Sequence, residues 1–155
     1  MEFTVLSNNM GYAVNDKNQK NLYNVRKKTF GKKWNLLDPN KYNLYTLAQM
    51  GDEKRPLFAI ILNDTTFLTI ECKSLFLDPS FTCKGKTISY TLASKDRREF
   101  DIIVNDNSVG HISTKVGVTG ELLYDVTVDN KFFDDYICLF PVIIDKTFGE
   151  MNKQV

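Results

Sequence analysis

The stretch from Phe132 to Phe148 is the most apolar part of the chain and constrains its fold more than any other segment. Read as a helix, it carries apolar side chains on every side, so no face is left for water and the helix must be enclosed. Its uncharged part lies between Asp135 and Asp145, whereas a membrane span needs about 20 apolar residues. The pattern therefore predicts a helix over about residues 131–148 that is buried inside protein.

The ends of this helix carry recognisable signals. Asp129 or Asn130 can cap the N-terminus, and Gly149 can adopt the left-handed conformation that stops a helix. Pro141 lies inside the segment, where it removes one backbone hydrogen bond and clashes with the preceding turn. We therefore expect a kink or a break at Pro141.

Before residue 129 the sequence is a succession of short strands separated by turn residues. Apolar and polar residues alternate clearly in residues 87–93 and 122–128, which indicates a sheet with one buried face. About twelve antiparallel strands need two packed sheets or a closed barrel to hide their edges. The predicted strands are 3–7, 12–15, 21–27, 33–37, 42–49, 57–62, 66–73, 80–84, 87–94, 100–105, 109–115 and 122–128.

The apolar helix decides between these two architectures. A barrel of about twelve strands encloses a lumen too wide for its own side chains to fill. A helix of about 18 residues, roughly 27 Å long, is a suitable filling. The sequence therefore predicts a mainly β fold in a single domain over residues 1–155, a closed antiparallel β-barrel at about 3–128 around the C-terminal helix.

Composition narrows the function classes. The net charge of +1 argues against a specific nucleic-acid binder, and residues 1–5 lack the regions of a signal peptide, so we expect a cytoplasmic protein that is not transmembrane. Cys72, Cys83 and Cys138 form no CxxC pair, which fits a reducing compartment, and their apolar neighbours predict inert core thiols. Many Asn and Lys residues favour an AT-rich, bacterial genome.

Signals of catalysis are sparse. His111 is the only histidine, which excludes a multi-histidine metal site. Strand alternation places it on the face of Val109 and opposite Ile112, so we interpret it as structural or exposed to solvent. The chain contains no G-x-S-x-G, P-loop, G-x-G-x-x-G or H-E-x-x-H motif. The sequence thus predicts no catalytic residue, no cofactor and no metal.

Carboxylates offer three further candidates, two pairs and one single residue. The pairs Asp134/Asp135 and Asp52/Glu53 are explained by a helix N-terminus and a surface turn. Asp145 follows the apolar run directly, at the expected mouth of the barrel. It either caps strand backbone groups, faces water where the helix emerges, or serves a functional pocket.

The basic segment from Lys17 to Lys33 is the one charge feature that suggests a function. Residues 1–60 carry ten Lys or Arg against five Asp or Glu. Strand 21–27 should end near its last lysine, so that the segment up to Trp34 becomes a hairpin tip with cations beside Phe30. Such a tip suits anionic lipid headgroups or a weak nucleic-acid contact, and a solvated loop is the alternative. The candidate anionic-ligand patch comprises Arg26, Lys27, Lys28, Lys32 and Lys33.

Several short motifs stand in a characteristic order: Tyr12-x-Val14-x-Asp16, Leu22-Tyr23-x-Val25, Trp34-x-Leu36-x-Asp38, Phe100-x-Ile102, and Tyr124-x-Val126-x-Val128 before a helix that ends in Ile143-Ile144-Asp145. This order resembles the tubby C-terminal-like superfamily and, within it, the LURP-one-related branch with its small bacterial relatives. The resemblance implies a closed β-barrel around a central hydrophobic helix. Tubby domains bind phosphoinositides and the related scramblases are associated with membranes. No tubby lipid-binding motif matches residue by residue, so no site is carried over.

These observations favour a non-enzymatic binding or scaffold domain whose first partner class is an anionic lipid or membrane surface. One alternative is a protein–protein interaction domain that uses exposed loop residues such as Phe30, Phe76 and Phe81. Another is an enzyme of unrecognised chemistry, with a deep polar pocket containing His111 or Asp145.

Overall fold

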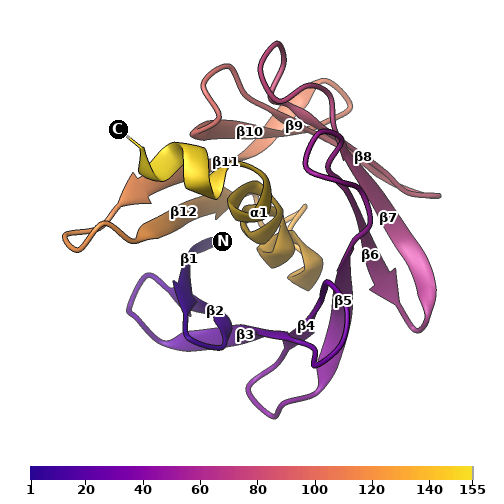
Figure 1. Ribbon diagram of the computed structural model, residues 1–155. Coiled ribbons are helices and arrows are strands. Elements are labelled where there is room, and N and C mark those ends of the chain that lie inside the picture. The colour runs from indigo at the N-terminus through magenta and orange to yellow at the C-terminus, as the bar shows by residue number, and fades with distance from the viewer. Residues whose placement is uncertain (155) are drawn as a thin grey trace.

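The computed structural model describes residues 1–154, and within them twelve strands form a closed antiparallel barrel. Each strand pairs with its neighbours in the sequence, and β1 closes the ring against β12 (Figure 1). The predicted barrel is confirmed, because all the predicted strands are present with ends that differ by at most two residues. The strands are β1 (Glu2–Asn8), β2 (Gly11–Asp16), β3 (Asn21–Lys27), β4 (Lys33–Leu37), β5 (Asn43–Gln49), β6 (Leu57–Leu62), β7 (Thr65–Cys72), β8 (Phe81–Lys84), β9 (Ser89–Ala93), β10 (Glu99–Val104), β11 (Asn107–Val116) and β12 (Leu122–Val128).

The lumen is filled by a short 3-10 helix, η1 (Asp135–Leu139), which leads directly into α1 (Phe140–Lys153). Figure 1 looks into the barrel and shows α1 inside the ring of strands. Every residue from Tyr136 to Ile144 is buried, so the predicted enclosure of the apolar run is confirmed. The helix and the inward faces of the strands form one common core.

The helix boundaries differ from the prediction at the N-terminal side. The cap is Asp134, whose carboxylate accepts a 2.7 Å hydrogen bond from the backbone N–H of Asp135, and not Asp129 or Asn130. Pro141 lies in the first turn of α1, where a backbone N–H has no partner within the helix. The expected break therefore falls at the junction of η1 and α1, and Pro141 begins the α-helix without kinking it.

The predicted stop at Gly149 is also wrong, because α1 continues to Lys153. Gly149 is needed for space: a Cβ atom there would lie 2.8 Å from Oδ1 of Asp145, one turn earlier. The glycine thus keeps the Asp145 carboxylate free to make other contacts.

Aromatic side chains hold the helices against the wall. Tyr136 of η1 packs against Tyr45, Phe67 and Tyr90, with ring centroids 5.0 to 6.1 Å apart. At the other end of the helical segment, Phe148 packs against two rings of the wall, those of Phe81 and Phe100, at 5.9 and 6.3 Å. The interpretation of Phe81 as an exposed loop residue is wrong, because it is fully buried in β8.

Asp145 ties α1 to two strands that flank β1. Its carboxylate accepts hydrogen bonds from the hydroxyl groups of Tyr12 in β2 and Tyr124 in β12, the latter at 2.7 Å. Burial, and then the negative charge of Asp145, raise the pKa of both tyrosines, so both remain hydrogen-bond donors. Asp145 therefore satisfies side-chain hydroxyls, and within residues 1–154 the backbone cap, one of the alternatives that the sequence left open, is not formed.

Strand direction gives the barrel two distinct ends. Because consecutive strands are antiparallel, loops that follow even-numbered strands share one end, and α1 enters the lumen there after β12. We call this the helix-entry end (loops 17–20, 38–42, 63–64, 85–88, 105–106 and 129–134). Loops that follow odd-numbered strands share the helix-exit end (loops 9–10, 28–32, 50–56, 73–80, 94–98 and 117–121). The amide of Asn152, near the end of α1, donates to the carbonyl of Arg97 at this exit end.

Replacing Asp145 with Ala should lower the free energy of unfolding by about 3 kcal/mol, since two largely buried hydroxyls lose a charged acceptor. Urea denaturation of wild type and variant measures the difference. Glu150→Ala is the control, because that glutamate is 91% exposed on the same helix. Equal stability losses in the two variants would contradict an anchoring role for Asp145.

Candidate functional site

The predicted basic hairpin is formed by β3, β4 and the loop between them. β3 ends at Lys27, as expected, and the backbone N–H of Lys28 donates to the carbonyl of Lys33 at 2.9 Å, which closes the base of the loop. Lys27, Lys28, Lys32 and Lys33 are all exposed. Phe30 at the tip is 85% exposed. The hairpin thus presents an aromatic ring among four cations at the helix-exit end.

The five residues of the predicted patch do not converge on one point. Lys28 and Lys33 flank Phe30 in a shallow depression at the tip. Arg26 lies in a groove of the outer wall, and its buried Nη1 has no hydrogen-bond partner among residues 1–154. Lys27 lines the mouth of the barrel. The patch is therefore a band of positive charge that runs from the mouth to the outer wall.

The mouth itself is an open cavity of about 520 Å³ between the hairpin and α1. On its lining, the Nζ atom of Lys146 lies 4.9 Å from the ring centroid of Trp34 and 5.7 Å from that of Tyr12. Burial lowers the pKa of Lys146; Asp145 opposes this shift, and the positive charges of Lys27 and Lys153 add to it. Asp145 and Glu150 also line the cavity, and Glu150 pairs with Lys153 at 3.6 Å. Lys27 and Lys146 are therefore the cations that a phosphate or carboxylate group bound in the cavity would neutralise.

Sequence reasoning missed Lys146 and Lys153, which also line this cavity. The available signal was strand order: a helix that follows an even-numbered strand through the lumen must leave at the end where the β3–β4 hairpin lies. Its C-terminal lysines therefore join the basic hairpin.

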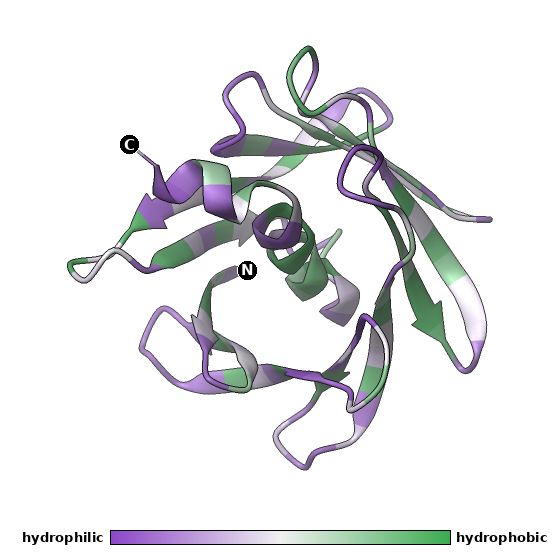
Figure 2. Cartoon of the chain, in the orientation of Figure 1, coloured by the Kyte–Doolittle hydropathy of each residue, from purple (hydrophilic) through white to green (hydrophobic). Residues whose placement is uncertain are grey.

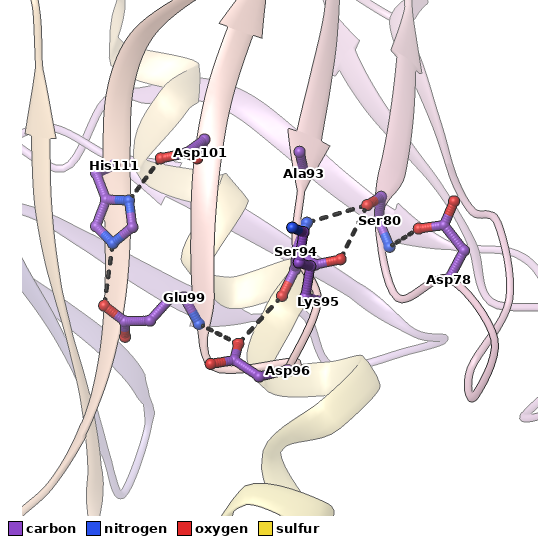
Figure 3. A pocket seen from close by; sticks show the side chains of 9 residues that line it. All are labelled: Asp78, Ser80, Ala93, Ser94, Lys95, Asp96, Glu99, Asp101 and His111. Atoms are coloured by element: carbon purple, nitrogen blue, oxygen red, sulfur yellow. Dashed lines mark hydrogen bonds and ion pairs between the residues drawn. The ribbon is translucent and has the colours of Figure 1, made fainter.

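A second depression, on the outer wall, contains His111 (Figure 3). Its Nδ1 lies 2.8 Å from a carboxylate oxygen of Asp101, and its Nε2 lies 3.0 Å from one of Glu99. A bulge in the β10–β11 pairing breaks the alternation of β11, so that Val109 is buried while the His111 side chain is 42% exposed. The expected shared face of His111 and Val109 is therefore wrong.

The His111 cluster is arranged for charge pairing. Both ring nitrogens are engaged by carboxylates on opposite sides of the ring, so the three side chains do not point to a common metal position. Within residues 1–154, no group of three His, Cys, Asp or Glu side chains is placed to hold a metal ion. The three cysteines are free and buried, and burial raises the pKa of the Cys72 thiol to about 11. The predicted burial of the three thiols in the core is confirmed.

The pKa of His111 should exceed its ordinary value. Burial lowers this pKa, but the hydrogen bonds and negative charges of Glu99 and Asp101 raise it by more. The pKa of His111 is thus higher in the folded than in the unfolded protein, so pairing with Glu99 and Asp101 stabilises the fold fully below pH 6.5. This stabilisation is lost as the pH rises through the folded-state pKa. His111 is the only histidine, so an NMR titration of its ring proton measures the shift directly.

Asp101→Asn should lower the pKa of His111, whereas Asp125→Asn, at a half-buried aspartate of the neighbouring β12, should leave it unchanged. Asp125 pairs with Lys115 and accepts from Thr4, away from the imidazole. A wild-type pKa at or below 6.5, or equal effects of the two variants, would contradict the charge-paired arrangement.

Comparisons with known proteins agree with this architecture. The family model for LURP-one-related proteins matches residues 2–145. The X-ray structure of a protein from Arabidopsis thaliana superposes with a TM-score of 0.53 over 97% of this chain and 90% of that one, at 14% sequence identity, which supports the fold alone. None of the curated proteins matches the sequence, and no helix within residues 1–154 is long and apolar enough to cross a bilayer. With its twelve-stranded barrel around a C-terminal helix, the chain belongs to the LURP-one-related family.

Proposed function

We propose that this LURP-one-related chain is a non-enzymatic binding domain that attaches to anionic phospholipid surfaces through the β3–β4 hairpin and the adjacent barrel mouth. The observation that carries the proposal is the gathering of cations at this place. The hairpin carries four exposed lysines, and one of them, Lys27, lines the mouth together with Lys146 and Lys153. No Asp or Glu occurs in residues 21–37, which form β3, the hairpin loop and β4.

The energetics favour a membrane surface. Each Lys or Arg near an anionic leaflet contributes roughly 1 kcal/mol, and the contribution falls off within a Debye length. Several lysines on one hairpin can therefore hold the protein at a membrane without a deep pocket. The open cavity beside Lys146 can take a single headgroup phosphate, with the Trp34 and Tyr12 rings beneath the lysine.

Two observations support a binding role over an enzymatic one. Both nitrogens of His111 are occupied by carboxylates, and both oxygens of Asp145 accept tyrosine hydroxyls. The two candidates for general acid or base chemistry are thus already engaged in the fold.

The free, buried cysteines fit a reducing compartment, so we place the protein on the cytoplasmic leaflet, which carries the anionic lipids.

Changing Lys27, Lys28, Lys32 and Lys33 together to Ala should weaken binding to anionic vesicles roughly a hundredfold or more at low salt. Co-sedimentation with phosphatidylcholine vesicles, with and without phosphatidylserine, measures the change. Wild-type binding should require the anionic lipid and should weaken as salt is raised.

The matched control removes the same number of charges from the helix-entry end, by changing Lys17, Lys20, Lys86 and Lys131 to Ala. These lysines are also exposed. Equal weakening in the two quadruple variants would mean that net charge alone drives binding. Absence of wild-type binding to anionic vesicles would refute the proposed function.

A further inference from the structure

Exposed apolar side chains gather at one end of the barrel. Within residues 1–154, eight large apolar side chains are strongly exposed, and seven of them lie at the helix-exit end. They come from five of its six loops or from the strand end next to one of these loops. The seven are Met10, Phe30, Met50, Phe76, Leu77, Val116 and Val118, while Tyr42 alone lies at the helix-entry end.

The tips of these loops are held by hydrogen bonds within each loop. In the β7–β8 loop, the N–H of Ser74 donates to the carbonyl of Asp78 at 2.9 Å, and the N–H of Leu77 donates to Oγ of Ser74 at 3.1 Å. Phe76 and Leu77 are nevertheless 74% and 93% exposed. Because the loop already satisfies part of its backbone, moving its tip into an apolar medium costs less than it would for an open loop.

The β11–β12 loop has the same design. Its base is closed by a 2.7 Å hydrogen bond from the N–H of Gly117 to the carbonyl of Glu121, and the N–H of Gly120 donates to the carbonyl of Gly117. Val118 at the tip is fully exposed. The tip has hydrophobic colouring in Figure 2, where the loop projects from the barrel wall.

Charge differs between the two ends as well. The loops of the helix-exit end contain eight Lys or Arg against five Asp or Glu, whereas those of the helix-entry end contain five of each. Lys27, Lys33 and Lys115 add positive charge at the strand ends beside the apolar tips. Glu99, at the start of β10, adds one negative charge at the same end, which keeps a net positive charge.

We infer that the whole helix-exit end is a membrane-docking face, in which the loop tips insert their apolar side chains at the headgroup–acyl boundary of an anionic bilayer. This inference rests on the proposed function and deepens it. Electrostatic attraction by the β3–β4 hairpin brings the protein to the surface, and Phe76, Leu77 and Val118 then add an interaction that salt does not screen.

The distribution of the tips favours a bilayer over a protein partner. Protein interfaces concentrate apolar residues in a core that is depleted of charge. Here the apolar residues are spread over five loops around the ring, with charged residues between them. Apolar residues interleaved with Lys and Arg are typical of surfaces that lie in the membrane interface.

Vesicle flotation at low and high salt tests the insertion. The double variant Phe76→Ser with Leu77→Ser removes one tip, and Val118→Ser removes a second tip from another loop. Tyr42→Ser is the matched control, because this residue is 70% exposed at the opposite end. On phosphatidylserine-containing vesicles at high salt, the double variant should bind roughly tenfold more weakly than wild type, Val118→Ser should also bind more weakly, and Tyr42→Ser should bind equally well.

Two outcomes would overturn the inference in distinguishable ways. If the tip variants bind like wild type at every salt concentration while the lysine variant loses binding, the proposed function stands and insertion is wrong. If wild type binds no anionic vesicle, the proposed function itself fails. Sedimentation that then shows a dimer, reduced to a monomer in the Phe76/Leu77 variant, would identify a second copy of the chain as the occupant of this face.

Discussion

Burial of an all-apolar helix inside the strand ring is the constraint on which the rest of the structure depends. The nine residues from Tyr136 to Ile144 are buried without exception. Outside a barrel, this segment would expose apolar surface on every side, and without the segment the lumen would lose the core that its inward-facing side chains pack against. Helix and strands therefore stabilise each other, and neither is expected to persist alone.

The same constraint decides which residues meet. Since the helix enters after β12 and leaves at the opposite end, its C-terminal lysines emerge beside the β3–β4 hairpin. Asp145 then fixes the helix between β2 and β12 through two tyrosine hydroxyls. The position of the basic mouth is thus a consequence of packing, because the groups that hold the helix in place also set Lys146 over the Trp34 ring.

The strands were predictable because alternation is a local signal, as in β12, where Leu122, Tyr124, Val126 and Val128 are all buried. The ends of the helix were less predictable from the sequence. Asp129, Asn130 and Asp134 are all chemically suitable caps, and packing selects among them. Gly149 suggested a stop from its conformational freedom, yet its role is steric and depends on a carboxylate one turn away.

Other errors come from non-local geometry. Phe81 was interpreted as an exposed aromatic residue, and only the barrel pairing shows that it faces inward. The bulge at β10–β11 changes the face of Val109, which strict alternation cannot reveal. The basic hairpin was visible from charge order, whereas Lys146 and the apolar loop tips become part of one surface only when strand direction assigns them to one end.

The most direct test of this organisation is NMR of the protein on anionic nanodiscs that carry a paramagnetic headgroup lipid. We predict signal loss in loops 9–10, 28–32, 50–56, 73–80 and 117–121, and none in loops 17–20, 38–42, 63–64 and 105–106. Signal loss at both ends, or along the outer wall, would contradict a barrel that docks by its helix-exit end.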